Sequence, residues 1–159
     1  MPTITPCLWF DGKAEEAATF YASLLPDSRI DKVLRAPGNY PSGKAGDVLT
    51  VEFTLMGRPF VGLNGGPHFK FNEAVSFQIE CATQEEVDYY WERLSEGGDP
   101  QAQQCGWLKD KFGLSWQIVP QVLAELLNDP DTAKSQRAFQ AMMQMKKLDI
   151  EGLQRAFAG

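Results

Sequence analysis

Residues 75–98, VSFQIECATQEEVDYYWERLSEGG, decide the fold, because they place a half-buried strand directly before a helix. In VSFQIEC, apolar and polar residues alternate, as in a strand with one apolar face. Thr83 and Glu86 have the capping-box spacing, so each can satisfy backbone donors at a helix start. Apolar residues then recur at helical spacing until the glycines at 97–98. The predicted buried stripe of this helix is Val87, Tyr90, Trp91 and Leu94.

Short strands are predicted next, near 102–109 and 114–119, with a turn at Phe112-Gly113. The charged residues at 109–111 are interpreted as a solvated hairpin tip. We interpret this half, about 73–120, as a βαβββ module.

The first half of the chain shows the same order of elements. A strand is predicted at 5–10, and a helix follows it until Pro26. Three further strands are predicted at 29–35, 48–56 and 59–64, the last two joined by a glycine turn. This half, about 1–66, is therefore a second βαβββ module, and the chain is internally duplicated.

Two stretches lie outside the duplication. Residues 36–46, APGNYPSGKAG, are interpreted as a long hairpin connection, with a lid over a pocket as the alternative. The tail, 121–159, has a helical pattern, with Asp129-Pro130 as a predicted helix start and Asp149 as another. Its apolar stripe favours packing over a ligand groove, and the packing surface can belong to the same subunit or to a partner: Phe139, Met142, Met143 and Met145.

Length and charge limit the class of protein. With 159 residues and 43% hydrophobic content, the chain is predicted to form one domain. A net charge of −6 without a basic cluster argues against nucleic acid as a partner. No segment approaches the roughly twenty apolar residues of a membrane span. Three widely spaced cysteines favour reduced thiols, so we expect a cytoplasmic protein: Cys7, Cys81 and Cys105.

Four segments carry a family resemblance: LWFDGKAEEAATFYASLLPDS (8–28), LNGGP (63–67), SFQIECATQEEVDYYWERL (76–94) and CGWLKDKFGLSWQIVP (105–120). Together they resemble the PhnB-like branch of the vicinal oxygen chelate superfamily, which also contains glyoxalase, bleomycin-resistance and dioxygenase proteins. The resemblance implies an α+β fold in which two tandem βαβββ modules form a cup-shaped mixed sheet, here followed by C-terminal helices. It also implies a homodimer.

Enzymes of that superfamily hold a divalent metal in the cup on histidine and carboxylate ligands. Where relatives read G-N-x-x-E, this chain has Gly113-Leu114-Ser115-Trp116-Gln117, so an amide replaces the carboxylate. The positions matching the histidine ligands fall near Thr5 and Ala74, and the only histidine is His68. Amide oxygens are weak neutral donors, so we predict a degenerate site with no metal and no cofactor.

Strand alternation indicates what remains in the cup. Leu114, Trp116 and Ile118 are expected to face helices, whereas Ser115 and Gln117 face the cup. A few amides among apolar walls suit a small-molecule ligand. The alternative is that the amides only satisfy each other or water. The predicted ligand-binding residues are Trp9, Asn64, Gln78 and Gln117.

Two functions therefore stay open. The first is a metal-free binding protein for an amphipathic or aromatic small molecule. The second is a metal-dependent lyase or dioxygenase-like enzyme with a relocated site, for which the candidate catalytic residues are His68 and Glu80, with Glu73 as a further acid.

Members of this branch often carry the description 3-demethylubiquinone-9 3-methyltransferase. A nucleoside cofactor of the usual methyltransferase fold binds at a glycine-rich turn between a parallel strand and a helix. The glycines at 65–66 and 97–98 follow a hairpin and a helix instead. We therefore expect that the description does not give the chemistry of this chain.

Overall fold

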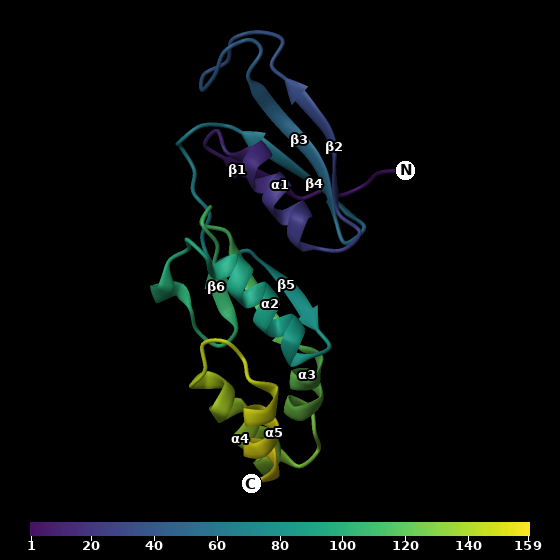
Figure 1. Cartoon of the computed structure of the whole chain (residues 1–159), viewed down its shortest axis with the longest axis vertical. Coiled ribbons are helices and arrows are strands. Elements are labelled where there is room, and N and C mark those ends of the chain that lie inside the picture. Colours follow the sequence, from purple (N-terminus) through teal and green to yellow (C-terminus); the bar gives the residue numbers. More distant parts are fainter. The chain divides into compact units, whose positions relative to one another are not determined.

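The computed structural model describes residues 1–159 and divides into two compact units, Met1–Phe71 and Asn72–Gly159 (Figure 1). Each unit contains its own mixed sheet and a helix that packs on it. The predicted α+β class with C-terminal helices is confirmed. The assignment of the whole chain to one domain stays a prediction.

The first unit has the predicted βαβββ order. Its strands pair in the order β1-β4-β3-β2, with β1 parallel to β4 and the other pairs antiparallel. The buried face of the helix includes Ala14, Ala17 and Tyr21. The elements are β1 (Cys7–Phe10), α1 (Ala14–Leu24), β2 (Arg29–Arg35), β3 (Val48–Leu55) and β4 (Arg58–Asn64).

Residues 36–46 connect β2 to β3. One backbone hydrogen bond, from Ala36 N to Asp47 O at 2.8 Å, joins the two ends of the loop, and another, from Tyr40 N to Gly43 O at 3.0 Å, closes its tip. The loop is therefore a hydrogen-bonded hairpin connection, and its role as a lid stays a prediction.

The second unit has one strand fewer than βαβββ requires. Its sheet has three strands in the order β5-β7-β6, with β5 parallel to β7 and β6 antiparallel to it. Where the missing strand was expected, Pro100 lacks an amide hydrogen and starts a 3-10 turn, and only Gln104 makes an isolated bridge, to Trp107. The elements are β5 (Ser76–Cys81), α2 (Gln84–Ser95), η1 (Pro100–Ala102), β6 (Trp107–Lys109) and β7 (Ser115–Pro120).

The capping box at the start of α2 is confirmed. The Thr83 hydroxyl accepts a hydrogen bond from Glu86 N at 3.2 Å, and the Glu86 carboxylate accepts one from Ala82 N at 3.2 Å. Val87, Tyr90 and Leu94 are buried as predicted, whereas Trp91, at the edge of the same stripe, is only half-buried.

The hairpin between β6 and β7 is organised by Asp110, which is 2% exposed. Its Oδ1 accepts hydrogen bonds from Phe112 N at 2.8 Å and Leu114 N at 3.0 Å, and its Oδ2 accepts one from Trp116 Nε1 at 2.9 Å. Gly113 supplies the positive φ of 85° that the turn needs. The prediction of a solvated tip is therefore wrong for Asp110, because these donors compensate the burial of its carboxylate.

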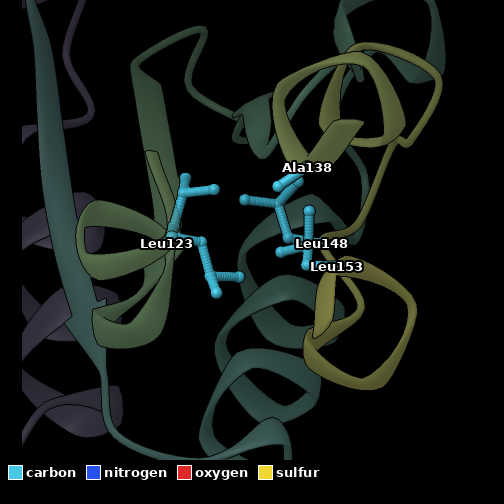
Figure 2. Packing of buried hydrophobic residues seen from close by; sticks show 5 residues of the cluster. Leu123, Ala138, Leu148 and Leu153 are labelled. Carbon is cyan, nitrogen blue, oxygen red and sulfur yellow. The ribbon is translucent and has the colours of Figure 1, made fainter. Parts of the chain in front are cut away.

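The tail forms three helices with a core of their own. α3 (Gln121–Leu127), α4 (Thr132–Met143) and α5 (Ile150–Ala158) surround a cluster of side chains that Figure 2 shows: Leu123, Leu126, Ala138, Leu148 and Leu153. None of the helices combines the length and apolar character needed to cross a membrane.

The predicted start of α4 at Asp129-Pro130 is wrong by two residues. Asp131 is the N-cap, and its carboxylate accepts a hydrogen bond from Lys134 N at 3.2 Å. Asp129 instead accepts a hydrogen bond from Asp131 N at 2.9 Å, within the turn that precedes the helix. Two aspartates two residues apart offer the same capping chemistry, and the second is the one that caps the helix. Asp149 precedes α5 as predicted.

The tail packs on its own unit. Gln84 on α2 donates a hydrogen bond to Leu148 O at 3.1 Å and accepts one from Ile150 N at 2.7 Å. Lys147 forms an ion pair with Asp88 at 2.8 Å, and this contact lowers the pKa of the Asp88 carboxyl. The sequence left open whether the tail packs on its own subunit or on a partner, and these contacts lie within its own subunit.

Replacing Asp110 by asparagine tests the hairpin. Asparagine has one side-chain oxygen where the carboxylate has two, so at least one buried donor loses its acceptor. We expect the free energy of unfolding to fall by about 1–3 kcal/mol. Urea unfolding followed by tryptophan fluorescence measures this. The control D129N changes a half-buried aspartate that accepts one hydrogen bond, from Asp131 N, which an asparagine oxygen can also accept, so its stability should stay within about 0.5 kcal/mol of the wild type. An equally small effect of D110N would contradict the assignment.

Candidate functional site

A pocket of about 660 Å³ lies in the second unit, on the sheet formed by β5, β7 and β6. Trp116 and Ile118 are buried on the sheet face that α2 covers, so alternation along β7 places Gln117 on the other face. The floor of the pocket is made by alternate residues of the three strands: Gln78, Trp107, Gln117 and Val119.

The structure brings the two predicted glutamines together. Gln78 and Gln117 are paired in register, and Gln78 Nε2 donates a hydrogen bond to Gln117 Oε1 at 3.2 Å. Gln117 Nε2 donates one to Ser76 Oγ at 2.9 Å. Gln78 Oε1 and one N–H of each amide are not used by these bonds. The amide pair therefore has two N–H donors, one on each glutamine, and one oxygen acceptor left for a further molecule.

Beside the amide pair, Lys109 forms an ion pair with Glu73, which lines the pocket. The hydrogen bond from Lys109 holds the pKa of the Glu73 carboxyl below its usual value. In the same row of the sheet Ser115 is fully buried, and its hydroxyl has no hydrogen-bond partner. The pocket thus has one charged lining residue, and that charge is paired.

The remaining walls were not predicted from the sequence. Ala102, Gln104 and Cys105 come from the segment before β6, and Leu123, Met142 and Met143 come from the tail. Trp107 was also missed, although it pairs with Gln117 across the hairpin. Pairing residues on either side of the Gly113 turn would have placed Trp107 opposite Gln117. The sequence analysis treated 102–109 as strand without assigning this pairing.

Trp9 and Asn64 lie in the first unit, and their side chains are used by the fold. Trp9 Nε1 donates a hydrogen bond to Gly66 O at 2.8 Å, and its ring meets Phe69 edge to face at 4.8 Å. Asn64 is buried; its Oδ1 accepts from Ala14 N at the start of α1, and its Nδ2 donates to Val48 O, both at 2.9 Å. A ligand role for either residue stays a prediction.

His68 and Glu80 are exposed, and neither lines the pocket. His68 follows the end of β4 in the first unit, whereas Glu80 lies on β5 in the second. Their catalytic role stays a prediction, as does that of Glu73, whose carboxylate is held by Lys109.

The residues at the site do not fit a divalent metal. No group of three or more histidine, cysteine, aspartate or glutamate side chains is placed to hold an ion. Around Gln117 the available groups are the neutral amides and hydroxyl of Gln78, Gln117 and Ser76. Metal sites in proteins are built from charged or imidazole donors, so this set is too weak.

Comparisons with known proteins agree with the resemblance seen in the sequence. The family model described as 3-demethylubiquinone-9 3-methyltransferase matches residues 2–119. The structure of the PhnB protein from Bacillus cereus is 38% identical, with a TM-score of 0.64, and the match covers 75% of this chain and 99% of that one. The chain therefore belongs to this family, the PhnB-like branch of the vicinal oxygen chelate superfamily.

More distant structures show the same fold alone. Protein PA1353 from Pseudomonas aeruginosa is 18% identical with a TM-score of 0.60, over 76% of this chain and 98% of that one. The fosfomycin resistance protein FosX from Mesorhizobium loti is 11% identical with a TM-score of 0.54, over 80% of this chain and 98% of that one. No curated protein matches the chain.

The three cysteines are free thiols in different environments, which gives a chemical test of the second unit. Burial raises the pKa of the Cys81 thiol to about 11, with Glu86 and Glu80 adding to the shift. At pH 8 only about one Cys81 in a thousand is a thiolate, which is the form that reacts with iodoacetamide. We expect native protein to gain at most two adducts by intact mass, and unfolded protein three. A third adduct forming as fast in the native protein would contradict this environment.

Proposed function

We propose that this protein binds a small organic molecule in the pocket of the second unit and needs no metal to do so. The observation that carries the proposal is the amide pair of Gln78 and Gln117, hydrogen-bonded to each other on the floor of an otherwise largely apolar pocket. Ligand pockets combine apolar walls with a few placed polar groups in this way.

Two features favour binding over an amide pair that only satisfies itself. The first is the unused hydrogen-bonding capacity, since the two amides offer more donors and acceptors than Ser76 and each other consume. The second is the size of the pocket, about 660 Å³, which lies within the range of about 300–1,000 Å³ typical of small-molecule sites.

Methyl transfer is not the function that this structure supports. Gly97 has a φ of 77° and follows the end of α2, and Gly66 follows β4, so neither glycine opens a helix after a parallel strand. Both sheets contain antiparallel pairs, unlike a doubly wound nucleotide-binding sheet. We take the methyltransferase description as a family name.

The oligomeric state and the alternative, metal-dependent function rest on the family resemblance. We propose a homodimer in the cytoplasm, as the superfamily likeness and the free cysteines favour. The metal-dependent lyase or dioxygenase gains no support from the site, because Glu73 is paired with Lys109 and the amides are neutral.

Native mass spectrometry of protein purified without chelator tests the proposal. We expect wild-type protein to carry an organic molecule and no stoichiometric metal. Replacing Gln117 by leucine removes its hydrogen bonds while keeping similar volume, and should weaken binding about tenfold, a loss of about 1.4 kcal/mol.

The control Q154L makes the same change at an exposed glutamine on α5 and should keep wild-type occupancy. The proposal fails if a divalent metal is bound stoichiometrically, or if Q117L retains the molecule as well as Q154L does.

A further inference from the structure

We infer that the C-terminal tail is the specificity wall of this pocket and selects an uncharged aromatic molecule. The inference rests on the proposed function and names the class of ligand for the same site. The observation behind it is that three tail residues line the pocket: Leu123 on α3 and Met142 and Met143 on α4.

The wall lies outside the part of the chain that the family model matches. The family model ends at residue 119, and all three tail residues lie beyond it. The floor glutamines lie inside it. The pocket therefore joins a polar floor inside the matched range to an apolar wall outside it.

The end of α4 is fixed to the segment before β6. Gln104 Nε2 donates a hydrogen bond to Met143 O at 2.9 Å. Next to it, Cys105 N donates to Met145 O and Gly106 N donates to Lys146 O, both at 2.8 Å. These three bonds hold the two segments side by side, so the wall keeps a defined position over the floor.

Gly106 makes this close approach possible. Its φ is 86°, and a Cβ atom there would lie 3.0 Å from Leu148 Cδ1 and 3.1 Å from Ile118 O. Leu148 is itself in the tail core shown in Figure 2. The tail core, the segment before β6 and the last strand therefore meet at a position where a Cβ atom would be tightly crowded and the backbone conformation favours glycine.

The two methionines have different roles. Met142 also packs against the tail core, so part of its surface stabilises the fold. Met143 is 44% exposed, and its sulfur lies 3.9 Å from the Cys105 sulfur at the pocket. The sequence left packing and a ligand groove as alternatives for this stripe, and Met143 has the exposure that a ligand contact needs.

The chemistry of the walls defines the ligand class. The single charged lining residue, Glu73, is already paired, so a charged ligand would enter without a partner. An aromatic body suits the Trp107 ring and the methionine sulfurs, which make favourable contacts with aromatic edges. A hydroxyl, amine or carbonyl group on that body can bond to the amide pair.

Binding of N-phenyl-1-naphthylamine, a neutral aromatic dye with one N–H group, tests the inference by its fluorescence increase. We expect saturable binding of one dye per chain to wild-type protein. Met143→Gln places a polar amide in the wall and should weaken binding at least fivefold. The matched control is Met56→Gln, the same change at a methionine of similar exposure, 49%, in the first unit; it should leave affinity within twofold.

A third variant separates the two proposals. Gln78→Trp fills the floor at an exposed position on the edge strand β5 and should abolish dye binding. If Q78W abolishes binding while M143Q does not weaken it, the pocket stands and the tail inference is overturned. If wild-type protein does not bind the dye, the ligand class is overturned. If Q78W binds normally, the dye is elsewhere and the proposed pocket itself is contradicted.

Discussion

The buried carboxylate of Asp110 is the interaction on which the candidate site depends. It collects two backbone donors of its own turn and the indole N–H of Trp116, so the turn and the direction of that ring are fixed together. Trp116 can then lie only on the α2 side of the sheet. Because successive side chains of a strand point to opposite faces, Gln117 must face the pocket. The same turn sets the register that places Trp107 opposite Gln117.

Glutamine serves two purposes in the second unit, and hydrogen-bond use distinguishes them. Gln84 spends its amide on structure: it donates to Asp88 Oδ1 at 2.9 Å and to Leu148 O, and it accepts from Ile150 N. One N–H group of that amide is therefore used within α2, and the other N–H group and the oxygen dock the tail. The amide of Gln78, exposed on the edge strand, makes one bond and keeps an N–H and its oxygen. Gln84 thus holds the tail against α2, whereas Gln78 has hydrogen-bonding groups left for a ligand.

Local patterns predicted the parts of the fold that local physics determines. The capping box at Thr83, the alternation in β5 and β7 and the turn at Gly113 all act over a few residues, and all are present. The burial of Asp110 could not be seen, because its donors become available only once the hairpin has closed. The strand expected near 102 failed because a 3-10 turn competes with it. Leu123 and Met143 were missed as pocket residues because tertiary packing alone brings the tail beside the sheet.

The amide at position 117 carries no charge, which suits a position beside the apolar tail wall. A carboxylate at this position would stand beside Leu123, Val119 and the methionines, and the nearby ammonium of Lys109 already belongs to Glu73. Without a metal or a second cation, such a charge would be unpaired at a half-buried position, which disfavours it. Glutamine keeps a donor for Ser76 and an acceptor for Gln78 and adds no charge. The neutral amide at position 117 and the apolar tail wall thus both favour the neutral ligand proposed for this pocket.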